Sequence, residues 1–406
     1  MQIYQKLLKR ISFFIFLVTA IFITLSGRYC DSEVFENDNL YTCTLTINTI
    51  GKGTVTVDPP GPYMNKDTVR LTAIANERWA FDRWENSLVA VDNPITITLI
   101  DTNTTVTAVF TYAGEPWRFV AVNDSRGSDN GINASILSEI AAAIIDEEAK
   151  LVLFAGDLVD GKPFYDTHLA QLNNWVSTFM EPLLDAGIQV YPVRGNHENK
   201  DYSLCIQAWN DVFTGKYDLP NNGPEGEKNL TYYVEYENAL FVCIDVYIEN
   251  NQSRVNQSWL DTVLTKKNVP HLFVTAHEPA YALSGGHSDC LDDYITERDV
   301  FINSIINAGG KTYFCGHDHV YDHAKINIDG EWFHQFIVGT GGAPLHWVDV
   351  GGGYVESNVE RVKHIRNYGY LVVEIDGMTV TMTFKSRTAE NTFVEKDVFF
   401  YEVGQQ

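Results

Sequence analysis

Cysteine is scarce in this chain, with six among 406 residues, and no two cysteines have the C-x-x-C spacing. A zinc knot held by paired thiolates is therefore excluded. Cys205 and Cys290 lie in loop-like or helix-start sequence, where a disulfide between them would be compatible with export. Cys243 and Cys315, by contrast, lie inside apolar runs and are expected to be buried free thiols.

Basic residues are scarce as well. The chain has 29 Lys and Arg against 53 Asp and Glu, which gives a formal net charge of −24 at pH 7. This charge argues against nucleic acid or an anionic membrane surface as a partner. An anionic substrate would have to be attracted locally, and bound cations would supply that attraction.

The apolar stretch from Ile11 to Leu25 is only 15 residues long, whereas a membrane-spanning helix needs about 20. Lys6, Lys9 and Arg10 precede it, so residues 1–26 have the pattern of a secretory signal. An uncleaved membrane anchor is the alternative. Either interpretation predicts export to an extracellular, periplasmic or cell-surface location, with attachment to the surface or membrane through the N-terminal segment if the anchor is kept.

Residues 41–112, which follow a linker at 27–40, have no helical period and predict a small all-β domain. Short alternating runs separated by turn residues are expected at 42–48, 53–57, 67–73, 94–99 and 104–110. The segments 51–60, 61–75 and Trp79-Ala-Phe-Asp-Arg-Trp84 resemble the internalin-type B-repeat of bacterial surface proteins. The pattern occurs once, so no repeat array is expected.

From residue 117 apolar strands alternate with amphipathic segments, which is typical of an α/β fold with helices on the faces of a sheet. The expected helices lie near 131–147, 167–186, 253–266 and 296–308. After residue 321 the pattern changes to antiparallel strands near 322–328, 332–338, 369–376, 378–386 and 393–402. The sequence 375–378 predicts a hairpin turn.

Five apolar runs of this region each end in a short polar loop with residues of metal-ligand type. The runs are 118–124, 151–157, 188–198, 272–277 and 312–319. Each has the length and the β-branched and aromatic content of a buried strand. Ligand-binding residues in α/β folds gather at the carboxyl ends of such strands. The loops offer only oxygen and imidazole donors, so they predict one metal site assembled from distant segments.

The order of these loops resembles the calcineurin-like metallophosphoesterases. The residues that carry the resemblance are Asp124, Gly156-Asp157, Gly195-Asn196-His197-Glu198, His277 and Gly316-His317-Asp318-His319. The segments 276–281, 316–321 and 339–344 resemble the purple-acid-phosphatase-like branch in particular. The resemblance covers residues 117–402.

This resemblance implies a two-sheet β-sandwich flanked by helices, with a site for two divalent or transition-metal ions such as Mn, Fe or Zn. Asp157 would bridge the ions, with Asp124 and His319 on one side. The other side would consist of Asn196, His277 and His317. His197, beside the acidic Glu198, would be held cationic and would protonate the leaving group.

The implied activity is hydrolysis of phosphate mono- or diesters by a metal-bound hydroxide at a dinuclear site. The alternative is a cell-surface binding or adhesion protein with a degenerate phosphoesterase domain. A phosphate ester is the expected partner in the first case, and the oligomeric state is left open by the sequence.

The first motif departs from the family pattern, because Asp124-Ser125-Arg126 stands where Asp-x-His is usual. Asp160 also stands where purple acid phosphatases have a Tyr. Arg126 would either grip a phosphate oxygen of the substrate or form a structural salt bridge to an acid such as Asp160. Two further histidines, His287 and His346, have Gly-rich surroundings that are compatible with the lining of a pocket.

Overall fold

The computed structural model describes residues 40–283, 287, 290–347 and 356–403. The predicted signal segment and most of the predicted linker lie outside these residues. Within the described part of the chain, no helix is both long and apolar enough to cross a membrane.

The β domain consists of two small sheets. The first has the order β3 (Tyr63–Met64), β1 (Thr42–Ile50), β7 (Asn103–Tyr112), β5 (Trp79–Asn86), and the second has β2 (Gly53–Asp58), β4 (Thr68–Ala75), β6 (Ile95–Thr98). All five predicted strands are present. The aromatic segment forms β5, and Trp84 on it is fully buried. The alternation of apolar and polar residues therefore predicted these strands correctly. Side chains at inward positions fill a core, and those at outward positions face water.

The α/β region is built on two larger sheets. In the six-stranded sheet the order is β12 (Gln189–Val193), β11 (Leu151–Ala155), β8 (Trp117–Ala121), β20 (Gly369–Asp376), β21 (Thr379–Arg387), β22 (Phe393–Glu402). β8, β11 and β12 are parallel, while β20 to β22 are antiparallel. The predicted hairpin joins β20 to β21.

The second sheet has seven strands. Their order is β13 (Tyr232–Tyr236), β14 (Ala239–Cys243), β15 (His271–Thr275), β16 (Thr312–Cys315), β18 (Glu331–Val338), β17 (Tyr321–Ile328), β19 (Val359–Ile365). β14, β15, β16 and β18 are parallel neighbours. All five apolar runs of the sequence therefore contain buried strands, three in one sheet and two in the other.

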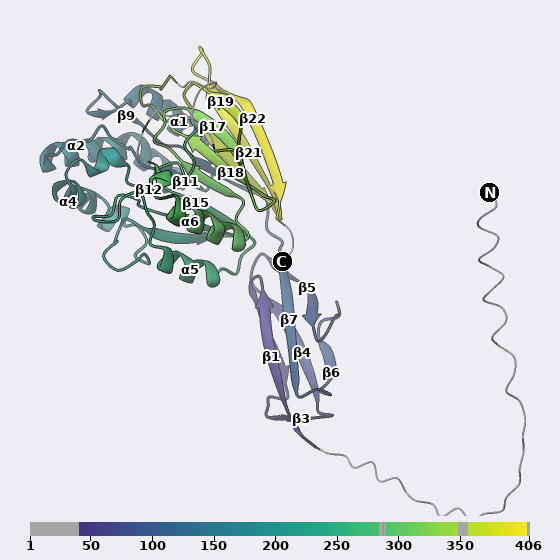
Figure 1. Ribbon diagram of the computed structural model, residues 1–406. Coiled ribbons are helices and arrows are strands. Elements are labelled where there is room, and N and C mark those ends of the chain that lie inside the picture. Colours follow the sequence, from purple (N-terminus) through teal and green to yellow (C-terminus); the bar gives the residue numbers. More distant parts are fainter. Residues whose placement is uncertain (1–39, 284–286, 288–289, 348–355, 404–406) are drawn as a thin grey trace, which may run out of the picture. The chain divides into compact units, whose positions relative to one another are not determined.

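Helices flank both sheets (Figure 1). They are α1 (Ala134–Asp146), α2 (Tyr165–Trp175), α3 (Glu181–Asp185), α4 (Tyr202–Val212), α5 (Gln257–Thr265) and α6 (Ile295–Asn307). Buried residues of α1, α2 and α4 share one core with the six-stranded sheet, and those of α5 and α6 share another with the seven-stranded sheet. The fold is therefore the expected two-sheet sandwich between layers of helices.

Several details differ from the sequence-based expectations, among them strands β13 and β14, which were not predicted. The helix predicted at 167–186 is interrupted by a π-helical turn at Val176–Met180. Helix α4 was not predicted, although Asp201 caps it and Cys205, Ala208, Trp209 and Val212 form a buried stripe at helical spacing. Strand β19 was not predicted either, because it is an edge strand without a buried face.

The disulfide considered for Cys205 and Cys290 is not formed. Both are free, buried thiols, as are Cys43, Cys243 and Cys315. Burial raises the pKa of the Cys205 thiol, and it raises that of Cys290 far more. These thiols behave as small apolar core residues.

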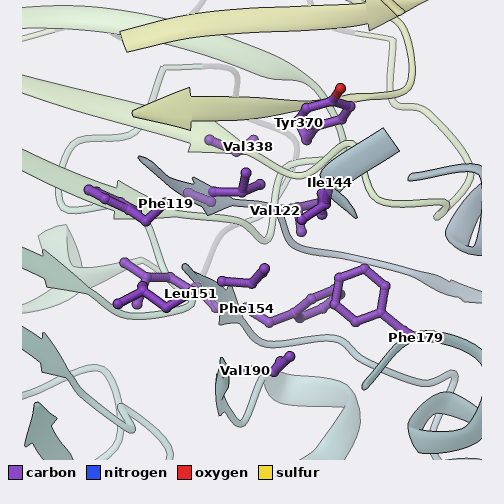
Figure 2. Close-up of a cluster of buried hydrophobic side chains, with 14 of the residues drawn as sticks. Phe119, Val122, Ile144, Leu151, Phe154, Phe179, Val190, Val338 and Tyr370 are labelled. Carbon is purple, nitrogen blue, oxygen red and sulfur yellow. The ribbon is translucent and has the colours of Figure 1, made fainter. Parts of the chain in front are cut away.

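Aromatic side chains join the two sheets. Phe119 on β8 is fully buried, and its ring centre lies 5.0 Å from that of Phe241 and 4.8 Å from that of Phe273. Figure 2 shows Phe119 in this buried cluster, together with Phe154 and Phe179. Alternate residues of β14 and β15 point to opposite faces, so the phenylalanines meet the first sheet while their neighbours meet α5 and α6.

Replacement of Phe119 by Ala should lower the free energy of unfolding by about 3–5 kcal/mol, because it removes a ring from a packed interface and leaves a cavity. Phe400→Ala on β22 is the matched control, since its side chain is 70% exposed, and it should change stability by no more than about 0.5 kcal/mol. Urea denaturation of both variants measures the difference. Equal stabilities would show that the aromatic interface does not hold the sheets together.

Candidate metal centre

The carboxyl ends of strands from both sheets bring the predicted ligands together. Asp124 follows β8, Asp157 follows β11 and His277 follows β15. One ligand-type atom of each lies within 4.8 Å of the others, and all three side chains are buried. Parallel strands direct their carboxyl ends to one edge of a sheet, so this convergence follows from the topology.

Three site residues have a left-handed backbone, which is uncommon for residues other than glycine. The φ angles are +62° at Asp124, +52° at Asp157 and +72° at His317. The backbone N–H of His317 donates to the Asp124 carboxylate at 3.1 Å. The backbone N–H of Asp124 donates to Gly156 O at 3.2 Å. Strained residues of this kind cluster at functional sites, where the surrounding structure holds them in place.

At two positions of the motifs only glycine fits, because the backbone lies directly against a carboxylate of the site. A Cβ on Gly195 would lie 2.3 Å from Asp157 Oδ1, and one on Gly316 would lie 2.2 Å from Asp124 Oδ2. Any side chain at either position would displace a carboxylate of the site. The glycines that precede Asn196 and His317 therefore allow the loops to pack directly on the acids.

The tautomer of His277 is fixed by its surroundings. Its Nδ1–H donates to Ala155 O at 2.7 Å, which leaves the Nε2 lone pair directed at the site. That Nε2 lies 3.4 Å from Asp157 Oδ1, 3.3 Å from Asn196 Oδ1 and 3.2 Å from His317 Nδ1. Burial lowers the pKa of His277 to about 4, so the ring is neutral and able to bind a metal.

His319 completes the other side of the cluster. Its Nδ1–H donates to Pro344 O at 2.8 Å, and its Nε2 lies 3.5 Å from Asp124 Oδ1. This buried Nε2 has no hydrogen-bond partner in the structure. A buried lone pair without a partner is costly, and a cation between His319 and Asp124 would satisfy it. The donor set and this atom therefore fit a metal.

The two buried carboxylates also favour a cation. Burial, followed by repulsion from Asp157, holds the pKa of Asp124 well above its usual range. At Asp157 burial acts in the same direction, but the imidazoles of His277 and His197 outweigh it and lower the pKa. A divalent cation between the carboxylates would stabilise the ionised form of both.

Glu198 does not contact the His197 side chain, so the expectation that it holds that ring cationic is wrong. Its carboxylate accepts the backbone N–H groups of Asp157, Val159 and Gly195 at 2.8–3.0 Å. It thus ties two ligand-bearing loops together. The pKa of His197 is lowered, chiefly by burial, although Asp157 opposes this shift.

His197 is oriented by Asp160 through the main chain. The His197 Nδ1–H donates to Asp160 O at 2.5 Å, and its Nε2 lies 3.9 Å from Asp157 Oδ2. The Asp160 carboxylate pairs with Lys162 at 2.5 Å and not with Arg126. The salt bridge considered between Arg126 and Asp160 is therefore not formed.

Arg126 lies inside the site, on the short strand β9 (Arg126–Gly127). Its Nε is 3.6 Å from Asp157 Oδ2, and this buried nitrogen has no hydrogen-bond partner. The guanidinium therefore faces the carboxylate that is expected to bridge the metals. A phosphate oxygen at the site would be within the reach of such a group.

A second cluster adjoins the centre, and the sequence identified it only in part. It consists of His287, Asp318 and His346, whose ligand-type atoms lie within 4.8 Å of one another. The His287 ring stacks on His317 at 3.8 Å between centres, and the His346 ring lies 3.9 Å from that of His319. The Gly-rich surroundings of the two histidines were a usable signal, whereas Asp318 was noted only as part of the 316–319 motif and was given no role.

These motifs and this geometry agree with the family comparison. The model of the calcineurin-like phosphoesterases matches residues 118–321, which is half of the chain. The chain therefore belongs to the calcineurin-like phosphoesterase family, a class of metal-dependent phosphoric ester hydrolases. A divergent InlB B-repeat domain matches residues 43–114, in agreement with the resemblance seen in the sequence.

Two curated relatives are purple acid phosphatases of Arabidopsis thaliana. Purple acid phosphatase 23 is 22% identical over 202 residues, which cover 44% of this chain and 43% of the relative. Purple acid phosphatase 15 is 25% identical over 172 residues, which cover 40% and 30%. The chain thus spans less than half the length of either relative.

Among solved structures, the purple acid phosphatase PPD1 of yellow lupin (Lupinus luteus) has a TM-score of 0.56 at 13% identity, over 87% of this chain and 74% of the other. PhoD has a TM-score of 0.54 at 12% identity, over 86% and 90%. At these identities the likeness shows the fold alone.

Proposed function

We propose that this protein is an exported phosphoesterase that hydrolyses phosphate mono- or diesters at a dinuclear metal centre. The observation that carries the proposal is the convergence of Asp124, Asp157 and His277 in a buried cluster, next to the unpartnered Nε2 of His319. The family match and the similarity to purple acid phosphatases support the reaction class.

In this proposal the ligand atoms would divide between two cations, with Asp157 shared by both. Asp124 and His319 would hold one ion, and the other would be held by Asn196, His277 and His317. Divalent cations supply positive charge to the phosphate oxygens and activate water for attack. The set lacks thiolates, which suits Mn, Fe or Zn.

His197 is placed to handle the proton of the leaving group. Its Nδ1–H is bound to Asp160 O, so only Nε2 faces the site. A phosphate dianion near this ring would favour the imidazolium, since opposite charges stabilise each other. The imidazolium then donates its Nε2 proton to the departing alkoxide.

Arg126 would bind a non-reacting oxygen of the phosphate. The first motif has Arg in place of the usual His, so one metal would have one ligand fewer than in the family pattern. A metal-bound His would be neutral, so a guanidinium adds a positive charge at this position, together with hydrogen-bond donors in a planar fork. The departure would therefore replace a neutral metal ligand with a cationic contact to the substrate.

The alternative is a surface adhesion protein, and the B-repeat match is the observation that favours it. A B-repeat domain would associate this protein with a surface in either case. The two functions differ in whether the metal centre turns over a substrate.

Hydrolysis of an aryl phosphate or a phosphodiester should be lost after treatment with a chelator and restored by Mn²⁺, Zn²⁺ or Fe. Asp157→Asn, purified in parallel, controls for contaminating phosphatases and should be inactive. Full activity of the metal-free protein would contradict the proposal, and inactivity of the metal-loaded protein on all esters would favour the adhesion function.

Arg126→Ala should lower kcat/KM by about 10²-fold, consistent with the loss of about 2–3 kcal/mol from a charge-assisted hydrogen bond, while metal content hardly changes. Arg126→His should restore the family motif and tighten metal binding. Arg118→Ala is the matched control, because Arg118 pairs with Glu374 at the opposite end of β8. Unchanged kinetics of folded Arg126→Ala would remove this residue from the active site.

A further inference from the structure

An exposed tryptophan lies next to the metal centre in sequence. Trp347 directly follows His346, and its side chain is 85% exposed, together with Val89 the highest value among the exposed large apolar residues of the described chain. An aromatic side chain exposed to water is unfavourable, but single exposed apolar residues are common on protein surfaces and do not by themselves indicate a site. The surroundings of Trp347 are what distinguish it.

The indole ring is held by a fixed cation. The guanidinium carbon of Arg366 lies 3.9 Å from the centre of the Trp347 ring. Arg366 is itself anchored, since its Nε donates to His346 O at 2.8 Å and an Nη donates to Leu345 O at 3.1 Å. The ring and its cation therefore rest on the same short segment, and the ring is oriented before any ligand arrives.

This segment is connected to the centre through His346. The His346 ring lies 3.9 Å from that of His319 and 5.0 Å from that of His287. The backbone N–H of His319 also donates to His346 Nδ1 at 3.3 Å. Trp347 is thus one residue from a side chain that touches a proposed metal ligand.

We propose that Trp347 and Arg366 form a stacking surface for the leaving group of the substrate, and that the preferred substrates are phosphate esters of a planar aromatic group, with a nucleotide as the representative. This inference rests on the proposed function, because the phosphate must bind at the metal centre. A phosphate held there leaves the rest of the ester to extend along the surface.

The chemistry of the pair suits such a ligand. Aromatic rings stack on indole over a large area at a low cost in side-chain entropy, and the contact tolerates different bases because every base has a π-face. Arg366 adds a positive charge beside the ring in a chain of net charge −24. An anionic aromatic ester would therefore meet attraction here that most of this acidic protein does not offer.

The test compares three substrates in the full-length, metal-loaded protein. Adenosine 5′-monophosphate and ethyl phosphate both release a primary alkoxide, so their comparison isolates the contribution of the nucleoside, and the loss in the Trp347 variants assigns it to the stacking surface. Phenyl phosphate shows whether a single ring next to the ester is enough. The variants are Trp347→Ala and Trp347→Phe, and the ratio of variant to wild type is taken for each substrate.

Trp332→Ala is the matched control. Trp332 is also exposed and also has a cation over its ring, with Lys325 Nζ at 4.8 Å. It lies at the turn end of the β17–β18 hairpin, opposite to the end that leads into the site. A general effect of removing surface tryptophan would appear in this variant too.

Trp347→Ala should lower kcat/KM for adenosine 5′-monophosphate by about tenfold, or about 1.4 kcal/mol, and leave ethyl phosphate within about twofold. Trp347→Phe should keep most of the preference, and Trp332→Ala should change neither substrate. Equal losses on both substrates, or no loss on the nucleotide, would overturn the proposal.

A binding measurement separates this inference from the proposed function. If no ester is hydrolysed, calorimetric titration of the same proteins with adenosine 5′-monophosphate and ethyl phosphate still decides the question. Tighter binding of the nucleotide, reduced about tenfold in Trp347→Ala, would support the stacking surface without the reaction. Equal affinities of wild type for the two ligands would overturn it.

Discussion

The enforced proximity of Asp124 and Asp157 is the constraint on which the site depends. Both carboxylates are buried, and repulsion by Asp157 adds to burial in raising the pKa of Asp124. Such a pair is costly unless positive charge lies between or beside it. The positive charge comes from Arg126 and, in the proposed enzyme, from two cations, and imidazoles lie beside both acids. The positions of the two acids therefore determine where the other groups of the site lie.

The two sheets hold these acids in place. Phe119 and the phenylalanines of β14 and β15 pack the two sheets against each other. In the loops that follow the carboxyl ends of the strands, Asp124, Asp157 and His317 have a left-handed backbone. Glu198 adds a link between loops by accepting three backbone N–H groups. Rigidity of this kind keeps ligands in position before a cation binds, which is what preorganised sites require.

Much of this arrangement could be predicted from the sequence, and for identifiable reasons. Each apolar run that ended in a ligand-type residue became a buried strand, because burial on both faces needs continuous apolar sequence. The pairing of Asp160 with Lys162 and the tie between Glu198 and the backbone could not be predicted. They depend on how the loops fold back, as does the contact of Arg126 with Asp157. The ring contacts of His287 with His317 and of His346 with His319 depend in the same way on the convergence of three distant loops.

The central claim is that these residues hold two metal ions. The metal content of the dialysed protein, measured by inductively coupled plasma mass spectrometry, tests it most directly. Wild type should retain two transition-metal ions per chain. Asp157→Asn should lose them because the proposed bridging ligand would be weakened, whereas His197→Ala should retain both, since the proposal gives this imidazole a role in proton transfer and not in metal binding. Fewer than two ions in wild type, or equal loss from both variants, would contradict the account.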